Sequence, residues 1–319
     1  MKQLFLSLLC VLLGLVDIHA GNSNIDSLQK IIKKESGAKK IEAQILLSQA
    51  IYDRSSASAI ALGSNAFLQS KKIANNELYV KAIVSLATLY QKTSRFDSAL
   101  VLYRQALEVN KTEDGLVEII DNIGVSYREI GKYDSALLYH IQSLKICETT
   151  GEKKGIALSL NYIGNVFIRN GSYDSALVYY NKSLKIRQEN HLTEDVAASF
   201  ENIGEVYKKR NQYDKALDYL TNALFLRQKI GNKSKTAYCY NSIGNFYLQL
   251  KIYDKAREYY SKSLDLRVEL GDKKDIASTY NNIGTLHREL QNYDKALEYL
   301  QKALFLRQQT GDNEAIAMS

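Results

Sequence analysis

The sequence predicts an all-α protein, built as a solenoid of about seven helical hairpins. Three observations support this prediction: a motif recurs every 40 residues, apolar residues inside each repeat have helical spacing, and none of the 319 residues is Pro. A chain without Pro can form one helix after another with no obligatory break. Apolar residues make up 45% and charged residues 24% of the chain, values typical of a folded, soluble protein.

The 40-residue period is carried by residues whose spacing does not drift. A fixed period indicates that each unit is a copy of one supersecondary structure that stacks on its neighbours. The Tyr-Asp pairs begin at Tyr133, Tyr173, Tyr213, Tyr253 and Tyr293. Glycines preceded by Ile lie at Gly124, Gly164, Gly204, Gly244 and Gly284, and alanines at Ala136, Ala176, Ala216, Ala256 and Ala296.

The first half of each unit, counted with Gly124 as position 8, has the pattern of a helix, here called helix A. Ile120, Ile123 and Tyr127 follow one another at steps of three and four residues. A Gly inside a helix costs about 1 kcal/mol relative to Ala, so its recurrence requires a packing reason. We expect Gly124 to let a partner helix approach closely, with the small side chain of Ala136 serving the same purpose on that helix.

The partner, helix B, is expected after a short turn. Asp134 is predicted at its N-cap or in its first turn, where a carboxylate meets free backbone N–H groups and the positive end of the helix dipole. An Arg suited to the C-terminal end of a helix dipole closes helix B, at Arg187, Arg227, Arg267 and Arg307. Glycines that stop the helix are expected four residues later, at Gly231, Gly271 and Gly311.

One unit contains Gly204, Tyr207, Ala216 and Ala223, and Asn-Ile-Gly begins at Asn202 in that unit. This pattern resembles the tetratricopeptide repeat in its longer, 40-residue form, which is similar to the repeats of kinesin light chains, of Leu-Gly-Asn-repeat proteins and of exported bacterial proteins. The family's Trp at position 4 and Pro at position 32 are missing, as is common in the long form. The resemblance implies a right-handed superhelical solenoid in which helix A lines the concave face.

The predicted domain organisation follows from this register. We expect a signal peptide at 1–20, an N-terminal capping helix at 21–39 and the start of an incomplete further repeat at 317–319. That last segment predicts that the natural protein continues or, less favoured, that its C-terminal end docks on a partner. The seven repeats are placed at 40–79, 80–116, 117–156, 157–196, 197–236, 237–276 and 277–316.

The first 20 residues have the composition of an export signal. Lys2 precedes an apolar stretch from Leu4 to Val16, and Ala20 supplies a small residue for cleavage. Thirteen apolar residues are too few to span a bilayer comfortably, so a cleaved signal is favoured over an uncleaved anchor. The sequence therefore predicts a periplasmic or extracellular protein with no membrane span in the mature chain.

Asparagines recur along one side of helix A, at positions 5, 6 and 9 of the unit. Asn is unfavourable inside helices, so its repetition needs a reason. A carboxamide pairs with both the N–H and the C=O of an extended peptide, so the first reading is a peptide-binding ladder. The second is that the amides bond neighbouring helices, and the sequence leaves both open. The candidates are Asn122, Asn161, Asn165, Asn202, Asn241, Asn245, Asn281 and Asn282.

Cations follow at positions 12 and 13 of helix A. They either capture carboxylates of a partner or pair with nearby glutamates such as Glu129 and Glu289. The net charge of +7 is a mild bias toward an acidic partner. Because the positive charges form no basic block, nucleic acid is not an expected partner. The candidate binding cations are Arg128, Arg169, Lys208 and Arg288.

The sequence gives little support for catalysis. Glu201 and Glu205 are one helical turn apart, but no nucleophile accompanies them. The three histidines that follow the signal lie in different repeats, and no Gly-rich phosphate loop is present, so we predict no metal, no cofactor and no enzyme activity. Cys147 and Cys239 lie in repeats that are not adjacent, so we expect two buried thiols rather than a disulfide.

The predicted function is therefore a non-catalytic scaffold outside the cytoplasm that binds a protein or an extended peptide segment. The alternative is drawn from the resemblance to exported bacterial repeat proteins. In that alternative the chain is the sensory N-terminal region of a larger membrane signalling protein, either a histidine kinase or a DNA-binding regulator.

Overall fold

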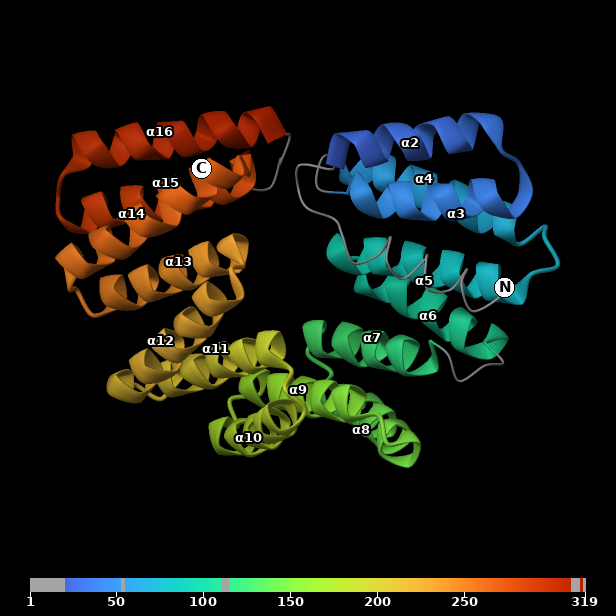
Figure 1. The fold of residues 1–319 in the computed structure, drawn as a ribbon, viewed down its shortest axis with the longest axis horizontal. Coiled ribbons are helices and arrows are strands. Elements are labelled where there is room, and N and C mark those ends of the chain that lie inside the picture. The colour runs from blue at the N-terminus through green and yellow to red at the C-terminus, as the bar shows by residue number, and fades with distance from the viewer. Residues whose placement is uncertain (1–20, 53–54, 111–114, 311–315, 318–319) are drawn as a thin grey trace. The chain divides into compact units, whose positions relative to one another are not determined.

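The computed structural model describes residues 21–52, 55–110, 115–310 and 316–317. The predicted export signal and Gly311 lie outside these residues. Within them the chain forms 15 long α-helices, α2 to α16, and no strand (Figure 1). The all-α prediction is therefore confirmed. The chain divides into two compact units, Met1–Lys132 and Tyr133–Ser319, called unit 1 and unit 2 below.

Unit 1 begins with α2, which packs on α3 through Ile25 and Leu28 against Ala43 and Leu47. The predicted capping segment, 21–39, thus holds α2 and the first residues of α3. The hairpins α3–α4 and α5–α6 follow, and then α7. The bounds are α2 Gly21–Lys34, α3 Gly37–Ala50, α4 Ser56–Ser70, α5 Asn76–Lys92, α6 Phe96–Val109 and α7 Leu116–Glu129.

Unit 2 consists of α8 and four hairpins that follow one another in chain order (Figure 1). In each hairpin the first helix is helix A and the second is helix B of the predicted repeat. The hairpins are α9 Lys153–Arg169 with α10 Tyr173–Glu189, α11 Thr193–Lys209 with α12 Tyr213–Ile230, α13 Lys233–Gln249 with α14 Tyr253–Leu270, and α15 Lys273–Glu289 with α16 Tyr293–Thr310. The first helix, α8, spans Tyr133–Thr150.

The glycine of helix A permits the close helix contact that the sequence predicts. A Cβ added at Gly164 would lie 2.6 Å from the ring of Tyr180, a distance that real Cβ atoms essentially never show. At Gly204 the same atom would lie 3.3 Å from the backbone oxygen of Ala216. Ala216 is completely buried, so both helices use their smallest residues where they meet.

Aromatic rings stack between the two helices of each hairpin of unit 2, one turn from the glycine. All of them except the buried His287 are half-buried, which suits Tyr because its hydroxyl can reach water while the ring packs. The ring centroids are 5.4 Å apart for Phe167 and Tyr179, and 5.5 Å apart for Tyr207 and Tyr219, for Tyr247 and Tyr259, and for His287 and Tyr299.

The helix ends follow the sequence signals. Gly231 and Gly271 are left-handed C-cap residues, and Asp214 lies in the first turn of α12 rather than at its N-cap. From α5 onward, each turn from helix A to helix B also contains one left-handed residue, although only two of the six are Gly. These are Ser94, Gly131, Gly171, Asn211, Lys251 and Gln291.

Replacing Lys251 by Gly is expected to stabilise the protein. Lys251 has φ of +59°, a conformation that costs an L-residue about 1–2 kcal/mol and that Gly adopts freely. The greater backbone entropy of unfolded Gly offsets part of this gain, so the net increase should be about 1 kcal/mol or less. The midpoint of urea unfolding measures it. Ser261→Gly, at an exposed position inside α14, is the control and should lower the midpoint.

His287 should make the stability of unit 2 depend on pH. Its pKa is lowered from 6.5, first by burial and then by Lys295 and Arg257, while Glu298 acts in the opposite direction. The folded state therefore binds the proton less readily than the unfolded chain. Stability attributable to this group is complete above about pH 6.5 and declines as the pH falls below it.

The substitution His287→Tyr introduces the residue that stands at this position in three other repeats, as Tyr127, Tyr207 and Tyr247. The urea midpoint of the variant, measured between pH 5 and pH 8, should fall less on acidification than that of the unchanged protein. Equal pH dependence of the two proteins would assign the effect to other groups.

Candidate functional site

The candidate site is the surface of unit 2 formed by the A helices α9, α11, α13 and α15, called the A-helix face below. Positions 5, 9 and 12 lie on this side because residues at i, i+4 and i+7 share one face of a helix. The predicted site residues from Asn161 onward belong to this face. Asn122 and Arg128 lie on α7 in unit 1, where the backbone oxygen of Asn122 accepts a hydrogen bond from Gln91 at 3.1 Å.

Four of the predicted asparagines bond neighbouring A helices in pairs. The Nδ2 atom of Asn202 donates to Oδ1 of Asn161 at 2.8 Å, which joins α11 to α9. Asn282 donates in the same way to Asn241 at 2.9 Å, which joins α15 to α13. Asn161 and Asn241 are each 8% exposed, so these bonds satisfy polar groups that would otherwise be costly to bury. Packing therefore occupies one end of each of these amides.

Two further asparagines bond to helix B of their own hairpin. Tyr180 donates its hydroxyl hydrogen to Oδ1 of Asn165 at 2.6 Å, and Tyr260 donates to Asn245 at 2.7 Å. Asn281 is half-buried, and its backbone oxygen accepts a hydrogen bond from the hydroxyl of Thr285 at 3.0 Å. The assignment of these residues as ligand contacts stays a prediction.

Three of the four predicted cations form ion pairs with a glutamate on their own helix. The pairs of Lys208 and Arg288 are at least partly exposed and contribute little to stability, so these two cations stay available to a stronger anionic partner, whereas Arg128 is only 14% exposed. Lys208 pairs with Glu205, Arg288 with Glu289 at 3.5 Å, and Arg128 with Glu129 at 2.7 Å.

The fourth cation, Arg169, lines a shallow hollow of about 490 Å³ at the edge of the A-helix face. Its lining combines two cations and a carboxylate with apolar walls, so a polar segment with an acidic group fits its chemistry. The lining residues are Ile168, Arg169, Gly171, Tyr173, Glu205 and Lys209.

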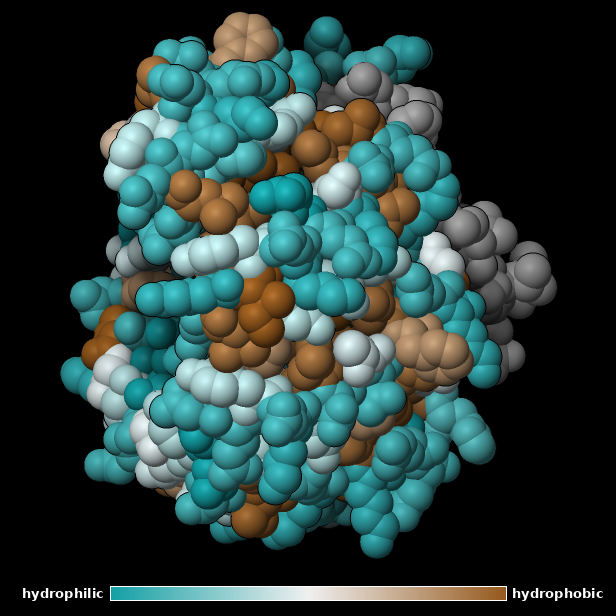
Figure 2. Space-filling model, turned by 90° about the vertical axis from the view of Figure 1, so that its left-hand side faces the viewer, coloured by the Kyte–Doolittle hydropathy of each residue, from teal (hydrophilic) through white to brown (hydrophobic). Residues whose placement is uncertain are grey.

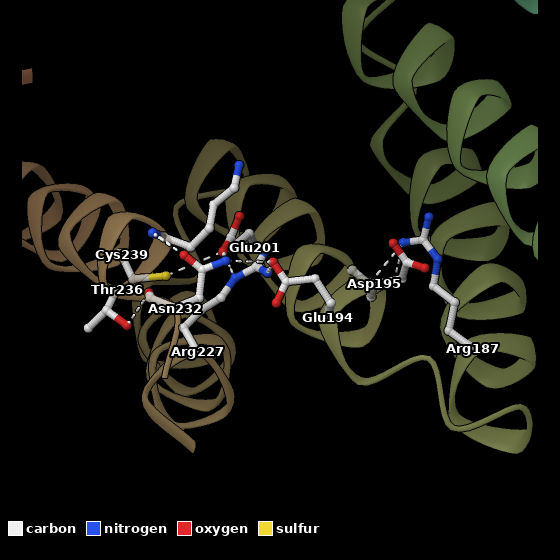
Figure 3. Close-up of polar contacts among 10 residues, drawn as sticks. Arg187, Glu194, Asp195, Glu201, Arg227, Asn232, Thr236 and Cys239 are labelled. Atoms are coloured by element: carbon white, nitrogen blue, oxygen red, sulfur yellow. Dashed lines mark hydrogen bonds and ion pairs between the residues drawn. The ribbon is translucent and has the colours of Figure 1, made fainter. Parts of the chain in front are cut away.

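The arginines at the end of helix B are not simple helix-dipole cations. Arg187 is 5% exposed, and its Nη1 donates to Oγ of Ser199 at 2.7 Å and to the backbone oxygen of Asp195 at 3.1 Å (Figure 3). Arg267 makes the equivalent bonds, including one to Thr279 at 2.7 Å. Burial lowers the pKa of both guanidinium groups. Each arginine thus links its helix to the next A helix through hydrogen bonds. This role could not be predicted from its position near the end of helix B.

Arg227 makes a different tie, to two carboxylates (Figure 3). Its Nε lies 3.2 Å from Oε1 of Glu201, and its Nη1 pairs with Glu194. Burial lowers the pKa of Arg227, but Glu201 and Glu194 outweigh it, so the pKa is raised. Burial, and then Glu201, raise the pKa of the Cys239 thiol, which stays protonated and donates to Glu201 at 3.3 Å. Glu201 is therefore engaged in packing.

No group of three His, Cys, Asp or Glu side chains in the described residues is placed to hold a metal ion. Within the same residues, no helix combines the length and apolar character needed to cross a membrane. On the side of the molecule drawn in Figure 2, apolar side chains form separate patches between hydrophilic ones. Cys147 and Cys239 are both buried, and neither is part of a disulfide.

The ion pairs of Arg227 predict that its two carboxylate partners contribute unequally to the stability of the protein. Glu201 is 20% exposed and Glu194 is 46% exposed, while Arg227 is 3% exposed. Glu201→Ala should therefore cost about 2–4 kcal/mol because it leaves a buried guanidinium without its less exposed counter-charge, whereas Glu194→Ala should cost less than about 1 kcal/mol. Urea unfolding of both variants measures the difference. A larger loss at Glu194 would contradict this account.

Solved structures with a similar fold were found at low sequence identity. A Rap protein complexed with Competence and Sporulation Factor has a TM-score of 0.62 and 13% identity, over 92% of this chain and 99% of that one. The Rap conjugation gene regulator of the plasmid pLS20, in complex with a Phr peptide, has a TM-score of 0.58 and 14% identity, over 93% and 98%.

A third similar structure is a signal transduction ATPase with numerous domains and a tetratricopeptide repeat sensor, from Pyrococcus horikoshii. Its TM-score is 0.61 and its identity 17%, over 92% of this chain and 47% of that one. None of the curated protein sequences compared with the chain matches it.

The tetratricopeptide repeat model matches the sequence in five overlapping segments, 81–149, 116–189, 155–229, 195–267 and 235–309. Together they span more than half of the chain, in the register of the hairpins described above. The chain therefore belongs to the tetratricopeptide repeat family.

Proposed function

We propose that this protein is a non-catalytic scaffold that binds an extended peptide, or an extended segment of a protein, along the A-helix face. The observation that carries the proposal is the hydrogen bonding of the asparagine side chains on this face. Asn161, Asn165, Asn241 and Asn245 each use the carboxamide oxygen within the fold, and in the described residues none of their Nδ2 groups donates a hydrogen bond. A row of hydrogen-bond donors suits the main chain of a peptide.

Two further observations support this function. Two structures of the same fold are complexes with Competence and Sporulation Factor and with a Phr peptide. The cations Lys208, Arg288 and Arg169 lie at the edge of the face, so we propose that the bound segment is acidic. The carboxylates that suggest acid–base chemistry, Glu201 and Glu205, are both occupied by cations of the fold, which supports a scaffold without catalysis.

Selection from a library of random linear dodecapeptides tests the proposal. The purified protein is expected to enrich acidic peptides, and the anisotropy of one enriched, fluorescein-labelled peptide then gives its Kd. A variant with Asn281→Ala, Lys208→Ala and Arg288→Ala should weaken binding about tenfold or more, because it removes one amide and two charges. The far-ultraviolet dichroism should not change.

The matched control places the same kind of change on exposed parts of the B helices, as Lys185→Ala with Lys229→Ala. This control should bind the peptide as the unchanged protein does. Equal weakening in both variants would indicate general charge attraction, and failure to enrich any peptide would contradict the proposed function.

We propose that the protein acts outside the cytoplasm, because residues 1–20 have the composition of an export signal.

A second candidate function is that of the sensory region of a larger signalling protein. It is favoured by the similarity to the signal transduction ATPase, which carries a tetratricopeptide repeat sensor and of which this chain matches 47%. Intact mass and membrane fractionation of the native protein separate the two. A soluble species of 36.1 kDa less the signal favours the exported scaffold, and a larger, membrane-bound species favours the sensor.

A further inference from the structure

The hairpins of unit 2 alternate in chemistry, so their full period is 80 residues rather than 40. The hairpins α9–α10 and α13–α14 have Asn at position 9 and Tyr on the facing helix, as Asn165 with Tyr180 and Asn245 with Tyr260. The hairpins between and after them have Leu at the Tyr position, Leu220 and Leu300, with Glu205 and Thr285 at position 9. The asparagine therefore occurs where the tyrosine does.

The two tyrosines are rigidly held. Tyr180 is 2% exposed and Tyr260 is 0% exposed, and each ring lies directly on the glycine of the A helix. A Cβ added at Gly164 or Gly244 would lie 2.6 Å from ring atoms, so the ring has no room to shift toward the helix. The hydroxyl at the end of such a ring has a fixed position, and it donates to the carboxamide oxygen 15 residues earlier.

That bond fixes which end of the carboxamide faces outward. Asn245 is exposed, and the oxygen of its side chain is held by Tyr260, so the NH₂ group is the part that a ligand meets. Without the hydroxyl the side chain could present either its oxygen or its nitrogen. Asn241, one turn earlier on α13, is oriented in the same sense because its oxygen accepts from Asn282. Asn241 is only 8% exposed, so Asn245 is the amide donor that α13 presents at the surface.

Satisfying a buried phenol does not require Asn. In the hairpin α5–α6 the hydroxyl of Tyr103 lies 3.0 Å from the hydroxyl of Thr88, at the same separation of 15 residues. Tyr103 is 0% exposed, so its environment matches that of Tyr260. Thr88, together with a longer bond from the same hydroxyl to Oε1 of Gln91 at 3.5 Å, meets the need of the tyrosine, whereas Asn brings an outward NH₂ group in addition. This extra group needs a function of its own.

We propose that Tyr180 and Tyr260 are positioning residues that turn Asn165 and Asn245 so that their NH₂ groups donate to main-chain carbonyl oxygens of a bound extended peptide. This inference rests on the proposed peptide-binding function and assigns its specificity. The A-helix face recognises the main-chain carbonyl oxygen, an acceptor that every peptide residue carries. It does so at two chemically equivalent residues, Asn165 and Asn245, which lie 80 residues apart in the sequence. The contacts at these places therefore do not depend on the side chains of the ligand.

The test uses the full protein and one fluorescein-labelled dodecapeptide that it enriches from the random library. Tyr260→Phe keeps the ring and removes the hydroxyl, and Asn245→Thr reproduces the pair seen at Thr88 and Tyr103. Each should raise the Kd about fivefold, the value of one hydrogen bond. Tyr103→Phe is the control, because it loses the same kind of buried hydroxyl, whose partners Thr88 and Gln91 lie in unit 1 and are not part of the A-helix face. It should leave the Kd unchanged and lower the urea midpoint as Tyr260→Phe does.

A second readout excludes a purely structural effect. Each amide of the peptide is replaced in turn by an ester, which weakens its carbonyl oxygen as an acceptor. One ester position should weaken binding to the unchanged protein but not to Asn245→Thr. Identical ester scans for the two proteins, or unchanged binding by Tyr260→Phe, would overturn the inference while leaving the proposed function in place.

Two other results would also decide the matter. If exchanging Asp for Asn in the peptide, rather than any ester, abolished the difference between the unchanged protein and Asn245→Thr, the acceptor would be a side-chain carboxylate and the inference would be wrong. If the unchanged protein enriched no peptide at all, the proposed function and this inference would fail together.

Discussion

The close approach of helix A to helix B, at a position that tolerates no side chain, is the constraint on which the rest of the structure depends. Because Gly164 has no side chain, the ring of Tyr180 lies directly on it and the hydroxyl reaches the side chain of Asn165. Core packing and the polar A-helix face are consequences of one geometry.

The hairpin fold could be predicted from the sequence because a helix pair is a local structure. Every signal for it, from the glycine of helix A to the glycine that ends α12, lies within one period. The buried arginine ties could not be predicted in the same way. Arg187 bonds to Ser199, which lies 12 residues ahead on another helix, and only the fold brings the two together. Read alone, an Arg near a helix end indicates a dipole interaction.

The asparagines show a further limit of sequence reasoning. Packing and ligand binding look like alternatives while an amide is treated as one group. The structure separates its two ends, since Asn161 and Asn241 accept through oxygen and keep their nitrogens free of internal bonds in the described residues. The pairing of Asn245 with Tyr260 was visible in the sequence as an 80-residue period, but the stronger 40-residue period concealed it.

The alternation of the hairpins also restricts how many repeats such a chain can gain or lose without disrupting the contacts between them. Arg187 and Arg267 each face a hydroxyl at position 3 of the next unit, whereas Arg227 faces a unit with Cys239 at that position and relies on carboxylates instead. Loss of the hairpin α11–α12 would place Arg187 beside the repeat that contains Cys239. Arg187 would then have neither a hydroxyl nor a carboxylate as its partner. Gain or loss of two hairpins would place each of these arginines beside the same kind of partner as before. The repeating unit of these contacts is therefore a pair of hairpins.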